Sequence, residues 1–142
     1  MYKRIIVGID FSPKTDRAVQ SALRLAKHAG GTVVLLHVLP AAVDGQRGAP
    51  GSETEVRRTI EQRLQEEAQR VATASGATVD YGVCEGDVVD EMVKYIERWG
   101  GDVFVVATEG RTGLGRILIG SVAERLLQKS PVPVLVIGPT VH

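Results

Sequence analysis

Four short runs of consecutive apolar residues, rich in β-branched side chains, constrain the fold of this chain more than any other feature. They are Ile5–Ile9, Val33–Val38, Val103–Val106 and Val134–Ile137. A strand with one face in water alternates apolar and polar residues, so continuous runs predict strands buried on both faces, as in a parallel sheet covered by helices. A fifth segment, Thr78–Val83, alternates imperfectly and contains a charge, which is typical of an edge strand.

Segments with helical periodicity lie between these runs. The first predicted helix has Ser12 as its N-cap and Pro13 at its first position, and it ends at Gly30. The others are predicted from about Glu53 to Ser75, over Val88–Ile96 with an end at Gly100, and from Ser121, in a capping box with Glu124, to Ser130. This alternation predicts an α/β fold, a doubly wound five-stranded parallel sheet with helices on both faces.

The strand order decides where a ligand can bind. Sheets of this type commonly have the order 2-1-3-4-5 or 3-2-1-4-5, and the polar third strand favours the second order because it belongs at an edge. In that order the winding reverses between the first and fourth strands. We therefore expect a ligand crevice beyond their carboxyl ends, at residues 10–12 and 107–120.

Size and composition exclude several classes of protein. A chain of 142 residues corresponds to one domain, which we expect to span residues 1–142. Seventeen Lys and Arg residues balance seventeen Asp and Glu residues, which argues against a partner such as nucleic acid or an anionic membrane. No apolar run approaches the ~18 residues of a membrane span, so a soluble cytoplasmic protein is expected. The single cysteine, Cys84, excludes an internal disulfide and is expected to be a packed side chain.

Two segments rich in glycine stand apart from the predicted helices and strands. Pro40 to Ser52 is either a disordered loop or a lid over the crevice. Residues 107–121 lead from a buried strand to a helix through four glycines and two arginines, Arg111 and Arg116. Glycines let backbone N–H groups approach an anion, and a helix start adds partial positive charge, so this segment predicts a phosphate site. The alternative is a surface loop with solvated arginines; neither a P-loop nor a dinucleotide fingerprint is present.

At the level of whole motifs, the sequence resembles the universal stress protein family over essentially its full length. The matching segments are IIVGIDFSPKTDRAV, VVLLHVLP, VVATEG and GRTGLGRILIGSVAERLLQKSPVPVLVI. ATP-binding members of that family carry Gly-x2-Gly-x9-Gly-Ser/Thr, and Gly110, Gly120 and Ser121 match this pattern. Ala107 stands where the family has its first glycine, close to the ribose, and an alanine fits there if its backbone φ is negative.

The resemblance implies roles for individual residues. Asp10 would hold the ribose hydroxyls, and the backbone of Val38 would contact adenine. The remaining implied positions are Ile9 and Val106 in the adenine pocket, and Gly110, Gly120, Ser121 and Val122 at the triphosphate, with Mg²⁺ or Mn²⁺ bridging phosphate oxygens. Arg111 is the cation that we expect at the rim.

Several of these residues also have a structural interpretation. Asp10 caps the first helix or its preceding turn in that interpretation, and Ser121 is expected to be a helix N-cap whether or not it also binds phosphate. His37 is expected to be a hydrogen-bonded core histidine, and His28 to interact with the carboxyl end of a helix.

The leading hypothesis is a small ATP-binding regulatory protein of the stress response. Any ATPase activity should be slow, because no general base is obvious beside the phosphates, although Glu109 or Asp10 could position a water molecule. The alternative is a non-nucleotide-binding homodimeric interaction module of the same fold; a nucleotide-dependent transferase is disfavoured by the short chain. The apolar edge strand Val132 to Ile137 predicts a homodimer, which the resemblance also implies.

Overall fold

The computed structural model describes residues 2–41, 52–108, 110–111, 117–118 and 120–138. Most of the predicted loop Pro40 to Ser52 lies outside these residues, as do Glu109, Gly113, Gly115 and Arg116. Side chains at 52–54, 110–111 and 117–118 are likewise not described.

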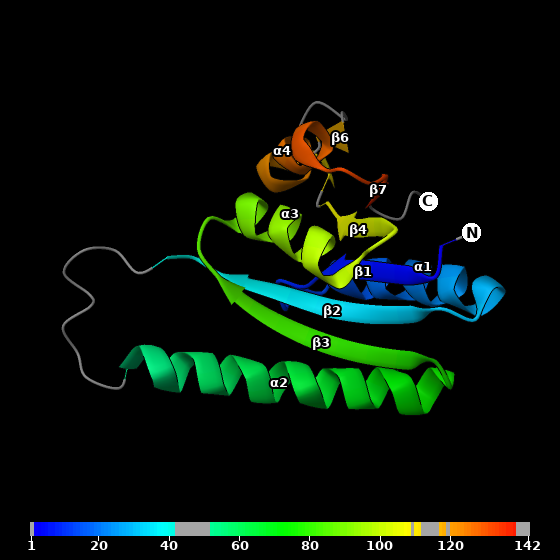
Figure 1. Cartoon of the computed structure of the whole chain (residues 1–142), viewed down its shortest axis with the longest axis horizontal. Helices are drawn as coiled ribbons and strands as arrows, with labels where there is room; N and C mark the ends of the chain where they lie inside the picture. The colour runs from blue at the N-terminus through cyan, green and yellow to red at the C-terminus, as the bar shows by residue number, and fades with distance from the viewer. Residues whose placement is uncertain (1, 42–51, 109, 112–116, 119, 139–142) are drawn as a thin grey trace.

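A five-stranded sheet forms the centre of the molecule, and all of its strand pairs are parallel (Figure 1). Its strands are β1 (Arg4–Gly8), β2 (Thr32–Leu39), β3 (Thr78–Glu85), β4 (Val103–Ala107) and β7 (Val134–Ile137). The order is β3-β2-β1-β4-β7, which confirms the predicted 3-2-1-4-5 arrangement with the polar third strand at an edge. A separate two-stranded antiparallel sheet of β5 (Gly110–Arg111) and β6 (Ile117–Leu118) was not predicted.

Helices cover both faces of the sheet, as the sequence predicts. They are α1 (Thr15–Ala29), α2 (Ser52–Ser75), α3 (Val88–Trp99) and α4 (Ser121–Lys129). One apolar cluster joins the sheet to α1 and α2, and a second joins it to α3 and α4. Within β1, Ile5 and Val7 belong to the first cluster and Ile6 to the second, all three fully buried. Since successive side chains of a strand point to opposite faces, this is why the run had to be apolar at every position.

The bounds of α2 and α3 agree with the sequence within one residue at their starts, whereas the N-caps predicted for α1 and α4 do not form. Gly30 and Gly100 close α1 and α3 in the left-handed conformation, with φ of 64° and 76°. The predicted N-cap at Ser12 is wrong: α1 begins at Thr15, and the hydroxyl and N–H of Ser12 both donate to Asp10 instead. The aspartate accepts both donors, so the chain forms a turn before the helix begins.

The helix α4 begins at the predicted residue, Ser121, but its predicted N-cap is wrong. Its N-cap is Gly120, and Ser121 is the first helical residue rather than the cap. The N–H of Glu124 donates to the carbonyl of Gly120 at 2.9 Å, so the capping box predicted between Ser121 and Glu124 does not form. The shift by one residue leaves Ser121 in the first turn of the helix, at the carboxyl end of the sheet.

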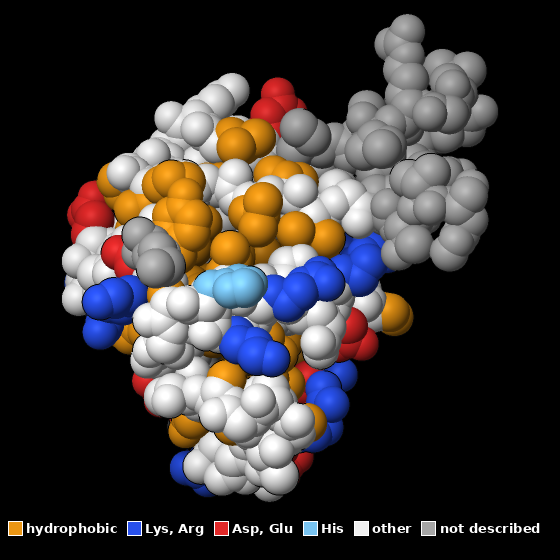
Figure 2. Space-filling model, turned by 90° about the vertical axis from the view of Figure 1, so that its right-hand side faces the viewer, with side chains coloured by type: hydrophobic (Ala, Val, Ile, Leu, Met, Phe, Trp, Pro, Cys, Tyr) orange, Lys and Arg blue, Asp and Glu red, His pale blue; other side chains and the backbone are white. Residues whose placement is uncertain are grey.

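The last strand forms an apolar edge. Leu135 in β7 is 38% exposed, and Leu127 on the neighbouring α4 is also exposed. Figure 2 is turned about the vertical axis of Figure 1, so its upper half is the part of the molecule that carries α4 and β7. Hydrophobic side chains gather in that half, whereas most Lys and Arg side chains lie across the middle and below. Within the described residues, no helix combines the length and the apolar character needed to cross a bilayer.

Candidate functional site

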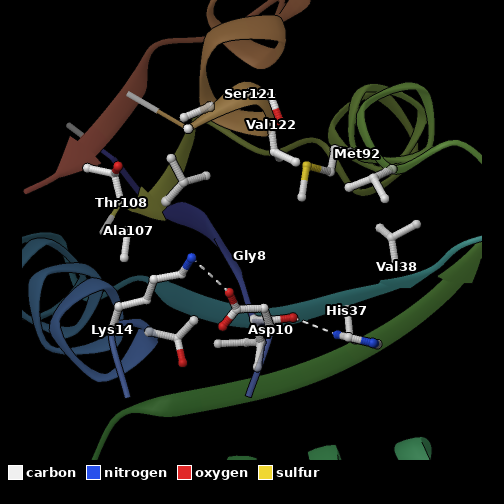
Figure 3. A pocket seen from close by; sticks show the side chains of 16 residues that line it. Gly8, Asp10, Lys14, His37, Val38, Met92, Ala107, Thr108, Ser121 and Val122 are labelled. Carbon is white, nitrogen blue, oxygen red and sulfur yellow. Dashed lines mark hydrogen bonds and ion pairs between the residues drawn. The ribbon is translucent and has the colours of Figure 1, made fainter. Parts of the chain in front are cut away.

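A cavity of about 510 Å³ opens at the carboxyl ends of β1 and β4, where the predicted strand order places a crevice (Figure 3). This volume is typical of small-molecule sites. Eight of the ten residues predicted for the site line the cavity: Ile9, Asp10, Val38, Val106, Ala107, Gly120, Ser121 and Val122. The structure thus brings together positions that are more than a hundred residues apart in the sequence.

The two remaining predicted residues, Gly110 and Arg111, form β5, which follows β4 closely in the chain. The side chain of Arg111 lies outside the described part of the structure, and so do Glu109 and the middle of the glycine segment. Their roles at the site remain predictions.

The cavity has an apolar side and a polar side. The apolar side is formed by Val38 from β2, Val88 and Met92 from α3, and Val106 and Val122. Polar groups are contributed by Lys14 and Thr108 on the other side, by Asp10 and Ser121, which face each other across the cavity, and by Thr15 and His37 (Figure 3). Figure 3 shows Val38 and Met92 on one side of the view, Lys14 and Thr108 on the other, and Asp10 between them. Such a division suits a ligand with a flat apolar part and a charged part.

The backbone of Val38 faces the cavity side of β2. The carbonyl of Leu36 accepts the N–H of Ile9 at 2.8 Å, whereas the carbonyl of Leu39 accepts the N–H of Gly86 on the β3 side. Backbone groups two residues apart in a strand point to the same edge, so the N–H and C=O of Val38 point toward the β1 edge. Because β1 ends at Gly8, that edge opens into the cavity beyond it.

Asp10 is held rigidly at the floor of the cavity. Its Oδ1 accepts the backbone N–H of Ser12 at 2.9 Å and the Ser12 hydroxyl at 2.6 Å, and its Oδ2 lies 3.2 Å from Nζ of Lys14. Burial acts to raise the pKa of the carboxyl, but the hydrogen bonds from Ser12 and Lys14 outweigh it and hold that pKa below its ordinary value. Asp10 therefore caps the turn before α1, as its structural interpretation expects, and presents an ionised carboxylate to the cavity.

The turn after Asp10 requires an unusual backbone conformation. Phe11 has a φ of 63°, the one positive φ among the described non-glycine residues. Its ring lies 4.9 Å from the His37 ring and under the guanidinium of Arg63, whose Cζ is 4.2 Å from the ring centroid. Nδ1 of His37 lies 2.6 Å from the carbonyl of Ile9, so this nitrogen carries the hydrogen and donates it. The prediction of a hydrogen-bonded His37 is confirmed, and the ring also reaches the cavity wall.

Ala107 fits the site without backbone strain. It is the last residue of β4 and pairs with Ile137 of β7, and it is not among the residues with positive φ. Its methyl group points into the cavity beside Thr108 (Figure 3). The backbone φ of Ala107 is therefore one that alanine adopts without strain. The substitution of the family's glycine affects a ligand through the space that one methyl group takes.

The first turn of α4 closes the cavity opposite Asp10. The backbone N–H groups of Ser121, Val122 and Ala123 precede the first intrahelical donor, Glu124, and carry the partial positive charge of the helix start. Apart from the atoms of Gly120 and its chain neighbours, a Cβ built on Gly120 meets no described atom within 4 Å. An anion can therefore approach these N–H groups closely.

Among the described residues, no three His, Cys, Asp or Glu side chains gather to form a metal site. Cys84 is buried, and desolvation raises the pKa of its thiol despite the nearby Arg98, in agreement with the predicted packed side chain.

Sequence reasoning missed Lys14, Thr15, Met92 and Thr108 as lining residues. For Lys14 a signal existed, since a lysine four residues after an aspartate at a strand end can reach back to it. Met92 and Thr108 carry no such signal, because an apolar helix stripe and a strand end look the same whether or not a cavity lies beside them.

Comparison with known proteins agrees with the fold. The family described as the universal stress protein family matches residues 1–138. Universal stress protein MJ0531 of Methanocaldococcus jannaschii is 31% identical over 140 residues, covering 96% of this chain and 82% of the relative. The solved structure of protein MJ0577 of the same organism superimposes with a TM-score of 0.77 at 27% identity, covering 100% of this chain and 99% of that one. A universal stress protein solved in complex with cAMP gives 0.73 at 27% identity, covering 96% and 97%. The chain belongs to the universal stress protein family.

Proposed function

We propose that this chain is a small, single-domain, cytoplasmic ATP-binding regulatory protein of the stress response, which holds the nucleotide in the cavity between β1 and β4. The observation that carries the proposal is the order of groups across this cavity: a backbone edge at Val38, the Asp10 carboxylate, and the first turn of α4.

Each part of a nucleotide has a chemical partner in this order. A purine fits the apolar side, where the N–H and C=O of Val38 offer one donor and one acceptor to its edge. The ionised carboxylate of Asp10 accepts hydrogen bonds from ribose hydroxyls. The N–H groups at Ser121 and Val122 suit phosphate oxygens because they combine free donors with the positive end of the helix dipole.

The cAMP complex of a relative supports a nucleotide as the ligand class, although cAMP itself is that protein's ligand. ATP is proposed here because Gly110, Gly120 and Ser121 keep the spacing of the ATP-binding pattern. In this proposal Mg²⁺ or Mn²⁺ is held by phosphate oxygens.

Hydrolysis is proposed to be slow. The pKa of Asp10 is held below its ordinary value by Ser12 and Lys14, so its carboxylate is a weak general base at neutral pH. Occupancy of the cavity, rather than turnover, is then the regulatory signal.

We also propose that two copies associate through β7. The strand is an apolar edge with Leu135 exposed, and an unpaired apolar edge favours association with a second strand. A two-fold dimer through residues 132–137 would cover it.

The experiment that tests the function has two stages. Freshly purified protein is denatured and the supernatant is assayed for released nucleotide, and nucleotide-free protein is then titrated calorimetrically with Mg-ATP. A micromolar dissociation constant, about −8 kcal/mol, supports the proposal. Neither released nucleotide nor heat up to millimolar ATP would refute it and favour the interaction module without a nucleotide.

A further inference from the structure

Lys14 is the one Lys or Arg among the described residues that line the cavity, and no part of the proposed function uses it so far. Its ammonium lies 3.2 Å from Oδ2 of Asp10, the carboxylate assigned to the ribose. In Figure 3 the side chain reaches over the cavity floor toward Asp10 from the side of Ala107 and Thr108. The cation therefore lies beside the ribose position, in the same cavity as the first turn of α4 that is assigned to phosphate.

The lysine of this pair is more sheltered than the lysine of a surface ion pair, whereas the two carboxylates are exposed to a similar degree, 48% for Asp10 and 53% for Asp90. Lys129 and Asp90 are also 3.2 Å apart, but the Lys129 side chain is 50% exposed, against 26% for Lys14. Water screens a partly buried charge less than an exposed one, so the ammonium of Lys14 should have a larger effect on the affinity for a charged ligand.

A ribose hydroxyl that donates to Oδ2 of Asp10 shares that oxygen with the Lys14 ammonium. Oδ1 is already engaged by both donors of Ser12. A nucleoside without phosphate gives the ammonium no new partner. A 5′-phosphate gives it one, because phosphate oxygens are strong acceptors for an ammonium on a flexible four-carbon stem.

We propose that Lys14 makes the cavity selective for 5′-phosphorylated nucleosides because its ammonium binds the phosphate nearest the ribose. The inference rests on the proposed function, since it concerns the same cavity. It assigns to Lys14 the role of a selectivity residue, whose ammonium gains a phosphate partner only when the ligand carries a 5′-phosphate.

The test compares adenosine with AMP in competition against a fluorescent ATP analogue, with EDTA present so that no metal bridges the phosphate. In Lys14→Met, the dissociation constant for AMP should rise about tenfold, the effect of one charge-assisted hydrogen bond. The constant for adenosine should stay nearly the same, because adenosine brings no phosphate to the ammonium. The preference for AMP over adenosine should thus shrink about tenfold, and Lys14→Arg should largely restore it.

Lys129→Met is the matched control, since it removes a lysine from an ion pair of equal length outside the cavity, and it should change neither constant. An unchanged preference for AMP over adenosine in Lys14→Met would overturn the inference even if ATP binds the wild-type protein normally. Absence of ATP binding by the wild-type protein would instead defeat the proposed function, and the inference with it.

Discussion

Gly120→Val provides the sharpest test of the site, because the structure separates its effect on folding from its effect on binding. The φ and ψ of Gly120 are −61° and 157°, an extended conformation that valine adopts readily, and no described atom lies within 4 Å of the added Cβ. Valine is a poorer N-cap than glycine, but it also lowers the entropy of the unfolded chain. These effects oppose each other, so the free energy of unfolding should change by less than about 1 kcal/mol.

Binding should change much more. Gly120 directly precedes Ser121 and Val122, the donors assigned to phosphate, so a branched side chain there should crowd the phosphate. Loss of two hydrogen bonds to a charged group costs about 3 kcal/mol or more, which corresponds to at least a hundredfold increase in the dissociation constant for ATP.

The assay pairs calorimetric titration with a thermal melt of each variant. Gly138→Val is the control, since its Cβ also meets no described atom within 4 Å and the residue does not line the cavity. Gly138→Val should bind ATP as the wild-type protein does. If Gly120→Val melts normally and binds ATP with unchanged affinity, the first turn of α4 does not hold the phosphates and the placement of the nucleotide is wrong.

Three further predictions follow from other parts of the structure. Ala107→Gly should lower the free energy of unfolding by about 1–2 kcal/mol, because glycine adds entropy to the unfolded chain and removes a methyl group. The dissociation constant for ATP, measured by calorimetry, should stay the same or fall. Weaker ATP binding would show instead that the methyl group contributes to binding. The backbone N–H groups of Lys3 and Arg4 donate to Asp102 and hold the pKa of its carboxyl below the ordinary 3.8 in the folded protein. The ionised carboxylate therefore stabilises the fold fully above pH 3.8, and this stabilisation is lost as the pH falls through the lowered pKa of the folded state. Urea midpoints measured between about pH 7 and 2 should show this loss of stability, and Asp102→Asn should make it smaller. Leu135→Lys should convert a dimer to a monomer with the fold retained, as measured by analytical ultracentrifugation, and a wild-type protein that is monomeric at micromolar concentration would contradict the dimer through β7.

The sheet was predictable because several strands carry the same sequence pattern, a continuous apolar run. Each central strand must be apolar on both faces, so the runs at Ile5–Ile9 and Val103–Val106 indicate buried strands independently of each other. The polarity of Thr78–Val83 then decides the strand order, and the order decides where the cavity lies. Three local features thus suffice to place Asp10 opposite Ser121.

The N-caps of α1 and α4 were not predictable in the same way, since a cap depends on competition between nearby donors and acceptors. Ser12 and Ser121 both have the residue type of an N-cap, and neither caps a helix in the structure. Ser12 donates to Asp10 instead, and the statistical preference of serine for N-cap positions does not predict this hydrogen bond. At Ser121 the preceding glycine takes the cap position, and the serine becomes part of the cavity wall instead.

Phe11 shows most clearly what a sequence alone leaves out. A positive φ at a bulky residue costs on the order of 1–3 kcal/mol and persists only where other contacts outweigh it. Here the Phe11 ring is held between the His37 ring and the Arg63 guanidinium, contacts worth about 0.5–1.5 kcal/mol each, and the following residue, Ser12, donates twice to Asp10. The strained turn therefore fixes the carboxylate of Asp10 at the cavity floor, through partners contributed by β2 and α2. Those partners lie 26 and 52 residues further along the chain, so no local pattern around Phe11 could have revealed them.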